Sequence, residues 1–309
     1  MRIALIGQAA FAVRILEQIQ QQGDEIVHLF APPDRDGRAD PLTLKARELG
    51  LPLSQPKSFR GTTAYEHFKS LRAELAVLAF ATIIVPERIL YEPRFKSICF
   101  HPSLLPRHRG ASGINWAIIQ GDTQTGVTWF WPDDGIDTGP ILIQKAVPIG
   151  ERDTVGSLYF NKLFPLGIET FAEAVRLIKE GRAPAIKQDE KLGTYEPPCR
   201  DEHAAIVFDR PAREVYNLVR GCDPQPGSYA WYAGKRLRLY EPTLEPVNPG
   251  ASPGTIIAIG PDGMRVALEG HTMTVRRVRL DPGSAKVAPV ELEQTGAIAP
   301  GMQAGAGPG

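Results

Sequence analysis

The sequence predicts an α/β fold, in which a doubly wound and mostly parallel sheet is followed by a small C-terminal β-barrel domain. Three observations support this fold class. Short apolar runs alternate with segments of helical apolar spacing over residues 2–181. The chain becomes polar and proline-bearing at residues 183–204. Beyond residue 228, short strand-like pieces follow one another between Gly and Pro residues, as they do in small barrels.

The first domain, residues 1–182, is expected to alternate strands with helices. Continuous apolar runs such as "RIALIG" are typical of strands that are buried on both faces. These runs predict strands at residues 2–7, 25–31, 74–80, 97–101, 126–131 and 139–149. Helical spacing predicts helices at residues 9–23, 40–50, 64–72, 114–121 and 154–181, the last with a bend at Pro165. Strands that alternate with helices favour a parallel sheet, because each helix returns the chain to the same edge.

The rest of the chain is expected to hold a linker, a barrel and a disordered tail. Residues 183–204 lack apolar periodicity and are predicted to be the linker. Residues 205–295 are predicted to form an OB-like β-barrel domain that begins with a helix at 212–221. Its strands are expected at residues 228–234, 235–242, 254–263, 264–270 and 272–280. Residues 296–309 are rich in Gly, Ala and Pro and are expected to be disordered.

Charge and cysteine content exclude several classes of protein. The formal net charge is zero, so the chain as a whole carries no electrostatic footprint for nucleic acid or for an anionic membrane. The three cysteines form no CxxC pair, so neither a disulfide framework nor a metal site is expected. The N-terminus lacks a signal-peptide pattern, and the apolar run from Leu75 is too short to span a bilayer. We expect a cytoplasmic protein that does not enter membranes.

The turn after the first predicted strand, "GQAAF", invites a dinucleotide interpretation. That fingerprint needs three glycines, for the tight turn, for the approach of the pyrophosphate and for helix packing. Only Gly7 is present here. We therefore expect no nicotinamide cofactor in this chain, and we interpret the turn as an ordinary strand-to-helix connection.

His101 is the first candidate catalytic residue. It ends the predicted strand at 97–101, and open α/β sheets bind ligands beyond the carboxyl ends of their strands. Pro102 and Pro106 stiffen the loop that follows. A single histidine is more often a structural residue, but Asp137 lies in "GIDTG", just before another predicted strand. A carboxylate beside an imidazole holds the ring and favours its protonated form, which suits proton transfer.

Other polar residues nearby have competing interpretations. Asp133 and Asp134 are expected to shape the turn that carries Asp137. Arg107 and Arg109 could bind a carboxylate or phosphate, or could make ordinary surface ion pairs. The remaining candidate is a thiol, Cys99, which stands in an apolar strand. We expect it to be a small buried hydrophobe and not a nucleophile.

Several segments together resemble one family, the folate-dependent formyltransferases, whose catalytic domain is Rossmann-like. "HPSLLPRHRGAS" (101–112) and "GIDTG" (135–139) resemble its catalytic motifs, and "FDRPAREVYNLVRGCDPQPGS" (208–228) resembles the start of its second domain. Within the family, the resemblance is greatest to the N-terminal hydrolase domains of 10-formyltetrahydrofolate dehydrogenases. "PDRDGRADPL" (33–42) and "LFPLGIETFAEAVRLIKEG" (163–181) carry that likeness, which extends to about residue 290.

The resemblance implies that 10-formyltetrahydrofolate is the substrate and formyl donor. His101 matches the catalytic histidine of the family, and Asp137 matches its essential aspartate, which also contacts the folate. Two further stretches match the folate site. They are the loop beside the folate, Ser103, Leu104, Leu105 and Pro106, and the backbone that hydrogen-bonds the pterin, Ile83, Ile84 and Val85. Backbone groups can read the edge of the flat pterin while apolar side chains cover its faces.

One position departs from the family pattern. Transferases of the family usually carry Asn-x-His, whereas the triplet here is Cys99-Phe100-His101. Losing a donor to a developing oxyanion typically lowers the rate by ~10²–10³-fold. The hydrolase domains of the dehydrogenases also lack this Asn. The resemblance therefore implies removal of the formyl group to give tetrahydrofolate and formate, or its passage to a carrier thiol. The dehydrogenases also have carrier and aldehyde dehydrogenase domains. This chain ends before both of them, so a separate carrier or aldehyde dehydrogenase protein could be a partner.

Three alternatives stay open. They are methionyl-tRNA formyltransferase, formyl transfer to a small amine such as an amino sugar, and a non-catalytic folate-binding module. The tRNA enzymes typically have a basic insertion after the second strand, but "PPDRDGRADP" (32–41) holds three Asp and two Arg. A nucleic-acid partner is therefore disfavoured. The missing Asn argues against an amine acceptor. In a non-catalytic folate-binding module, the loss of Asp137 would have no effect.

Overall fold

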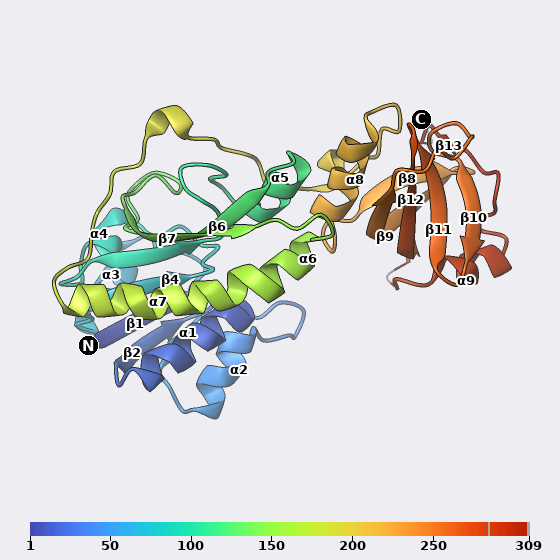
Figure 1. Cartoon of the computed structure of the whole chain (residues 1–309). Helices are drawn as coiled ribbons and strands as arrows, with labels where there is room; N and C mark the ends of the chain where they lie inside the picture. Colours follow the sequence, from blue (N-terminus) through green and yellow to red (C-terminus); the bar gives the residue numbers. More distant parts are fainter. Residues whose placement is uncertain (284, 308–309) are drawn as a thin grey trace. The chain divides into compact units, whose positions relative to one another are not determined.

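The computed structural model describes residues 1–283 and 285–307, which fold into two compact units (Figure 1). The first unit comprises Met1–Gly110, Gly126–Val147 and Asn161–Tyr195, and the second comprises Ala111–Thr125, Pro148–Phe160 and the chain from Glu196 onward. Neither unit is continuous in sequence. The limits expected from the sequence, 1–182 and 205–295, assume continuous domains and stay predictions.

The first unit is built on a seven-stranded sheet with the strand order β3-β2-β1-β4-β5-β6-β7. The strands are β1 (Arg2–Gly7), β2 (Glu25–Phe30), β3 (Leu53–Ser54), β4 (Leu75–Ala79), β5 (Ser97–His101), β6 (Gln124–Phe130) and β7 (Ile141–Pro148). Strands β1 to β5 pair in parallel, and β6 runs antiparallel to β5. The predicted doubly wound, mostly parallel sheet is confirmed. The two-residue strand β3 is too short to leave an apolar pattern in the sequence.

Helices cover both faces of this sheet. The helices α1 (Ala9–Gln21) and α7 (Phe164–Lys179) pack on the face seen in front in Figure 1, and α2 (Pro41–Glu48) lies beside α1. An aromatic cluster seals this face, since the ring of Phe11 lies 4.2 Å from Phe100 and 5.6 Å from Phe164. On the other face, α3 (Thr62–Ser70) and α4 (Glu87–Leu90) bury Phe68 and Ile89 in a second core cluster.

The long helix expected at residues 154–181 is divided into three pieces. A short helix α6 (Val155–Leu158) is followed by a π-helical turn at Tyr159–Leu163 and then by α7. Pro165 stands in the first turn of α7, directly after the π-helical turn, and has no N–H group to donate back into that turn. The interruption therefore precedes the proline, and the expected bend at Pro165 is replaced by a π-helical turn.

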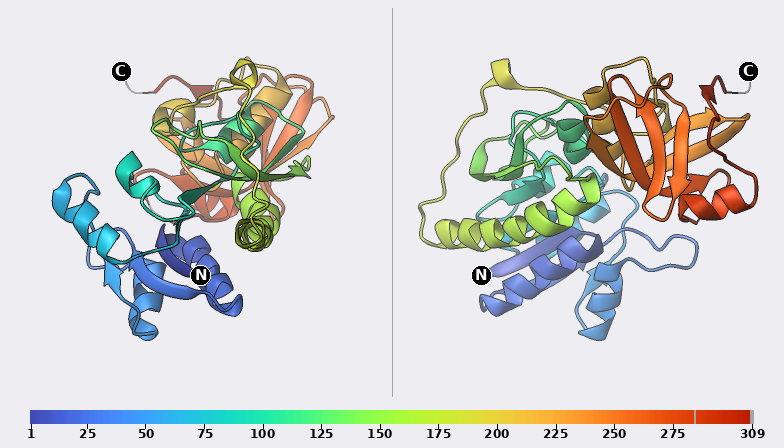
Figure 2. Two further views of the ribbon diagram at one scale, coloured as in Figure 1. Left: turned by 90° about the vertical axis from the view of Figure 1, so that its left-hand side faces the viewer. Right: turned by 45° about the vertical axis from the view of Figure 1, so that its right-hand side comes forward.

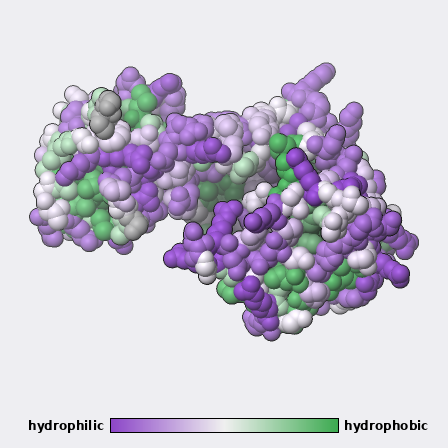
Figure 3. Space-filling view, turned by 180° about the vertical axis from the view of Figure 1, so that it is seen from behind, coloured by the Kyte–Doolittle hydropathy of each residue, from purple (hydrophilic) through white to green (hydrophobic). Residues whose placement is uncertain are grey.

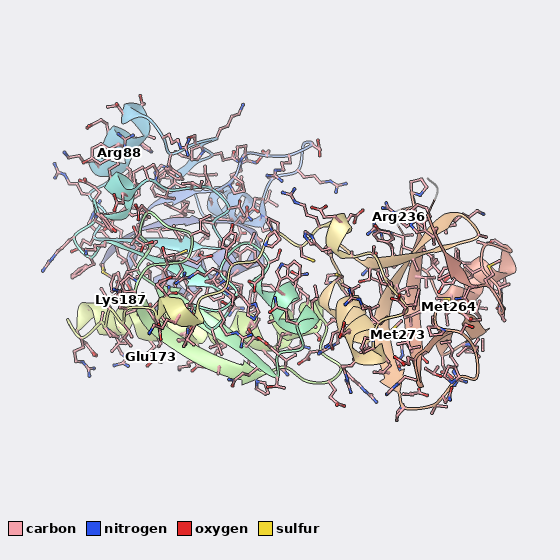
Figure 4. The ribbon with its side chains drawn as sticks, turned by 90° about the horizontal axis from the view of Figure 1, so that it is seen from above. Arg88, Glu173, Lys187, Arg236, Met264 and Met273 are labelled. Carbon is pink, nitrogen blue, oxygen red and sulfur yellow. The ribbon has the colours of Figure 1, made fainter. Side chains whose placement is uncertain are left out.

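The second unit combines helices with a six-stranded antiparallel sheet. Helix α5 (Gly113–Ile119) packs against α8 (Ala212–Gly221). The sheet has the order β10-β11-β12-β9-β8-β13 and curls on itself (Figure 2). Its strands are β8 (Ser228–Tyr232), β9 (Lys235–Glu245), β10 (Ile256–Gly260), β11 (Gly263–Leu268), β12 (His271–Leu280) and β13 (Ala304–Gly305). Met264 and Met273, labelled in Figure 4 on neighbouring strands, are fully buried in its core. The predicted small C-terminal barrel is confirmed in this curled form.

The segment expected to be disordered, 296–309, is ordered as far as the structure describes it. Ile298 is fully buried in the core of the second unit. Strand β13 pairs with β8. Ile256, at the start of β10, donates its N–H to the carbonyl of Met302 and accepts from the N–H of Gly301. Residues 301–305 thus bridge the two edge strands of the curled sheet. The amino-acid composition does not predict this ordered structure, because backbone groups, and not large side chains, make most of these contacts.

The face of the molecule drawn in Figure 3 is largely polar. Figure 3 shows charged and polar residues over most of one face, with small apolar patches between them. Within residues 1–283 and 285–307, no helix is long and apolar enough to cross a membrane.

Candidate active site

His101 lies at the carboxyl end of β5, where the sequence places it. Its neighbour on the adjacent strand is Thr128 of β6. The side chains of Cys99 and His101 point to the same face of the sheet, since they are two residues apart on one strand. The His101 side chain is only 7% exposed. A buried imidazole in this position is held by its neighbours and not by solvent.

Two contacts fix the His101 ring. Its Nε2 atom lies 2.7 Å from the carbonyl oxygen of His108. A carbonyl oxygen can only accept, so this contact assigns the proton to Nε2. The other ring nitrogen, Nδ1, lies 3.5 Å from Oδ2 of Asp137. Nδ1 therefore faces the carboxylate and is the nitrogen that can gain or lose a proton.

Asp137 lies on the turn between β6 and β7. Its Oδ2 atom accepts a 2.8 Å hydrogen bond from the backbone N–H of Gly110. Its backbone has a φ of 57°, which places a non-glycine residue in the left-handed region. The same turn is shaped by Asp133, whose Oδ1 accepts from Thr138 Oγ1 at 2.6 Å and from the N–H of Gly135 at 3.1 Å. The structure thus brings His101 and Asp137 together, with Asp133 in a supporting place.

The loop after His101 is tied to the sheet by its own polar groups. The hydroxyl of Ser103 is fully buried and donates to the carbonyl of Arg107 at 2.7 Å. The hydroxyl of Thr128 donates to the carbonyl of Ser103 at 2.6 Å. Leu105 is buried, whereas Leu104 and Pro106 are half-buried. Hydrogen bonds therefore hold the loop in place, and the Ser103 hydroxyl is engaged within it.

The two arginines of this loop differ. Arg107 is exposed, whereas Arg109 is buried and makes two hydrogen bonds of 2.8 and 2.9 Å to the carboxylate of Glu190. This bidentate contact raises the pKa of Arg109 above its ordinary value. Its Nη2 atom also donates to Oε1 of Gln188 at 2.8 Å. Arg109 is therefore committed to an internal ion pair, and the alternative of an anion-binding role is not supported.

Residues 183–195 are part of the first unit and lie against this loop, although the sequence suggests a linker. The backbone of Thr194 exchanges hydrogen bonds with Arg109 and Pro106, each of 3.1 Å. The Thr194 hydroxyl accepts from the backbone N–H of His108 at 2.8 Å. These contacts hold the peptide whose carbonyl accepts from His101. Sequence reasoning missed them because an extended segment without apolar alternation carries no strand signal.

Cys99 is half-buried and packs on the core cluster beneath α3 and α4. Burial, with the negative charge of Asp137, raises the pKa of its thiol well above the ordinary value. At neutral pH the sulfur is therefore a neutral thiol. This agrees with the expectation that Cys99 is not a nucleophile.

A pocket of about 300 Å³ lies at the carboxyl ends of β1 and β4, where the strand order reverses. Gly7, Thr82 and Ile83 line it, and two cationic side chains, Arg35 and Lys57, also contribute. A Cβ atom at Gly7 would lie 2.4 Å from the carbonyl oxygen of Ala79, so close strand packing explains this glycine. Open α/β sheets bind ligands at such reversal points.

The stretch matched to the pterin-binding backbone begins beside this pocket. Ile83 is half-buried, Ile84 is 70% exposed and Val85 is buried. A second pocket, of about 450 Å³, lies at the base of the turn that carries Asp137 and is lined by Tyr91, Trp131 and other residues. This second pocket lies at the amino end of β5, at the opposite end of the strand from His101, and its lining mixes aromatic with charged side chains.

Comparison with known proteins identifies the family of this chain. The model of the formyl transferase family matches residues 1–174, and that of the formyl transferase C-terminal domain matches residues 199–290. The mitochondrial 10-formyltetrahydrofolate dehydrogenase of Mus musculus is 43% identical over 79% of this chain, which spans 27% of that protein. Methionyl-tRNA formyltransferase of Desulforamulus reducens is 34% identical over 99% of this chain and 98% of its own length.

A solved structure shares the fold. HypX from Aquifex aeolicus, in complex with tetrahydrofolic acid, has a TM-score of 0.70 over 94% of this chain and 46% of its own, at 19% identity. The two family models together cover most of the sequence, and the methionyl-tRNA formyltransferase aligns from end to end. This chain belongs to the folate-dependent formyl transferase family.

Proposed function

We propose that this protein removes the formyl group of 10-formyltetrahydrofolate and releases tetrahydrofolate and formate. The observation that carries this proposal is the contact between His101, buried at the carboxyl end of β5, and the half-buried Asp137. The named 10-formyltetrahydrofolate dehydrogenases among the relatives support the choice of substrate. Because this chain spans only 27% of such a relative, the activity is proposed for this chain and not transferred from the whole enzyme.

The chemistry requires one proton to move from water to the leaving nitrogen. The oxygen of water bonds to the formyl carbon, the bond from that carbon to N10 breaks, and N10 takes up a proton. We assign the transfer to Nδ1 of His101, since Nε2 is held by the carbonyl of His108. Asp137 faces Nδ1, orients the ring and the attacking water, and stabilises the imidazolium while it carries the proton.

The folate is proposed to lie along the edge of the sheet that carries both residues. Ile83, Ile84 and Val85 would offer backbone groups to the pterin edge. The loop from Ser103 to Pro106 would lie beside the folate through its half-buried members, Leu104 and Pro106. The tetrahydrofolic acid in the HypX complex supports a folate ligand for this fold.

Water is the proposed acceptor because of Cys99. The resemblance assigns this position in transferases to an Asn, whose amide would polarise the formyl carbonyl. A neutral thiol packed on the core is a weak donor and a poor replacement. Without that donor, the attack of an amine gains less stabilisation than the family's transferases supply.

A second candidate is formyl transfer to methionyl-tRNA. The observation that favours it is the end-to-end similarity to a methionyl-tRNA formyltransferase. The loop after β2 argues against it, because Asp34 and Asp40 stand beside Arg35 and Arg38. Binding to tRNA, measured by electrophoretic mobility shift at low and moderate salt, separates the two candidates.

The deciding experiment incubates the purified full chain with 10-formyltetrahydrofolate alone. We expect formate and tetrahydrofolate to appear in equal amounts, and His101→Ala to abolish both. Small amines, a thiol and methionyl-tRNA are then added separately. No turnover without an acceptor, together with formylation of methionyl-tRNA, would reject hydrolysis in favour of the second candidate. Folate binding without turnover under all conditions would indicate a binding module.

A further inference from the structure

Two of the three cysteines lie side by side in the second unit. The Sγ atoms of Cys199 and Cys222 are 3.9 Å apart, and both are free thiols. Cys222 follows the last residue of α8 and is fully buried. Cys199 is half-buried and lies in irregular backbone just before the short 3₁₀ helix at Asp201–His203. One sulfur is therefore anchored, while the other lies on a segment that is free of regular structure.

We propose that this thiol pair is an oxidation site at which a small peroxide forms a disulfide. The half-buried sulfur of Cys199 passes its proton to the Cys222 sulfur and, as a thiolate, attacks one peroxide oxygen, which gives a sulfenic acid and releases water or an alcohol. The sulfur of Cys222 then attacks the Cys199 sulfur and expels hydroxide, which leaves as water. In sum, two thiols are oxidised to one disulfide, and one peroxide is reduced to water, or to water and an alcohol.

The surroundings of Cys222 suit it to the second step. The thiols of Cys199 and Cys222 lie within hydrogen-bond distance of each other and either sulfur can donate, while the guanidinium of Arg238 lies nearby. Both this contact and the guanidinium lower the pKa of Cys222, whereas the shared proton raises the pKa of Cys199. Arg238 is fixed by Asp201 and Asp281 at 2.8 and 2.9 Å, so its charge cannot move away. The buried member of the pair is thus the better attacking thiolate.

Formation of the disulfide requires the two sulfur atoms to move closer together. A disulfide needs a sulfur separation of about 2.05 Å, against 3.9 Å here. Two hydrogen bonds hold the Cys199 segment on α5. They are Cys199 N–H to Ser112 Oγ at 2.9 Å and Trp116 Nε1 to the carbonyl of Pro197 at 2.7 Å. The irregular segment can supply the shift, and the disulfide would then fix residues 197–199 to the end of α8.

The state of the pair is expected to affect the catalytic loop through the chain itself. Thr194, whose backbone and hydroxyl hold residues 106–109, precedes Cys199 by five residues. A disulfide that fixes Cys199 limits how far Thr194 can follow movements of that loop. This consequence rests on the proposed function, whereas formation of the disulfide does not.

The test uses the full chain and hydrogen peroxide, with mass spectrometry and thiol titration as readouts. We expect the free-thiol count to fall from three to one, with the loss of two hydrogen atoms in mass and a peptide that links Cys199 to Cys222. Dithiothreitol should reverse the change. Cys99→Ser is the matched control and should still form the link. Cys199→Ser and Cys222→Ser should not, and circular dichroism of each variant verifies its folding.

Three outcomes would overturn the proposal. They are oxidation of Cys199 beyond the sulfenic acid without a link, a link that involves Cys99, and unchanged thiols at peroxide levels that oxidise an unfolded sample. The deformylation rate is measured separately on the oxidised and reduced protein. If the disulfide forms and the protein has no deformylase activity in either state, the oxidation site stands and the proposed function fails.

Discussion

The side-chain amide of Gln188 donates hydrogen bonds to the carbonyl oxygens of Asp137 and Gly139, of 2.8 and 2.7 Å. Gln188 is buried, and its own oxygen accepts from Arg109. The amide is therefore hydrogen-bonded to the backbone of the turn on both sides of Thr138. It holds Asp137 in a left-handed conformation that costs a non-glycine residue roughly 1–2 kcal/mol.

Replacement of Gln188 is expected to lower kcat with little effect on KM. Gln188→Met keeps the length of the side chain but removes both donors, so the Asp137 turn can relax away from His101. A displacement of this kind typically costs about 10–100-fold in rate. The deformylation rate is measured across pH, and the pH profile should change because Asp137 no longer faces the imidazole. Gln20→Met, on the exposed surface of α1, is the matched control. If kcat and its pH profile were both unchanged, Gln188 would have only a structural role.

His101 and Asp137 are expected to act as one unit. His101→Ala and Asp137→Ala should each reduce deformylation by about 10²–10⁴-fold, in line with the loss of a positioned acid or base. The double variant should be little worse than either single variant, because both residues serve the same proton transfer. Rates of all three are compared on folded protein. Losses that multiply would contradict the shared step.

The sequence predicts these two residues for a physical reason. A buried parallel strand leaves a continuous apolar run, so the end of β5 and therefore the place of His101 can be read directly. The turn that carries Asp137 is marked by its glycines and by Asp133. Gln188 and Thr194 leave no such mark. They act through single hydrogen bonds to backbone groups far along the chain, and these follow from the folded path alone.

The end of the chain gives a second example. Composition suggests disorder for residues 296–309, whereas Ile298 is buried and residues 301–305 bridge the edges of the curled sheet. A segment without apolar periodicity can still be ordered when two open strand edges are available to it. Such order depends on the partner strands and is not encoded locally.

Ile298 is expected to contribute measurably to the stability of the second unit. Ile298→Ala removes a fully buried side chain and should lower the free energy of unfolding by about 2–5 kcal/mol. Urea unfolding is followed by circular dichroism. Val247→Ala is the control, since Val247 is 49% exposed and should cost far less. Equal effects of the two variants would show that the segment does not pack in solution as it does in the structure.

His28 is expected to make the protein less stable in acid. Burial, with the nearby charge of His67, lowers the pKa of His28 to about 4. Between pH 6.5 and 4 the unfolded chain binds a proton at this residue and the folded chain does not, so stability falls as pH falls. The full shift corresponds to about 3 kcal/mol at the acid end.

The measurement compares urea unfolding at pH 7 and pH 4.5 in the native protein and in His28→Gln. The variant should lose less stability between the two pH values than the native protein does. His271→Gln, at a partly exposed histidine of β12, controls for the loss of one histidine. The same pH dependence in all three proteins would contradict the assignment to His28.

Cys99→Asn is expected to shift the protein from hydrolysis toward transfer to an amine. Cys99 shares a sheet face with His101, so an amide there can approach the formyl oxygen that His101 serves. The donor helps only if it lies within about 3 Å of the oxygen in the transition state. Asn is also larger and more polar than Cys, and the apolar slot beneath α3 and α4 should resist it by about 1–3 kcal/mol of stability.

The ratio of amine formylation to formate release is measured on one folded preparation, with a small amine in excess. Cys99→Leu is the matched control, because it brings a side chain as large as Asn into the slot without a donor. If the amide is what matters, the ratio rises in Cys99→Asn and stays at the native value in Cys99→Leu. A rise in both would assign the effect to size, since only size is common to them. No rise in a well-folded Cys99→Asn would mean that the choice of acceptor is set by residues other than Cys99, because the donor would then be present and without effect.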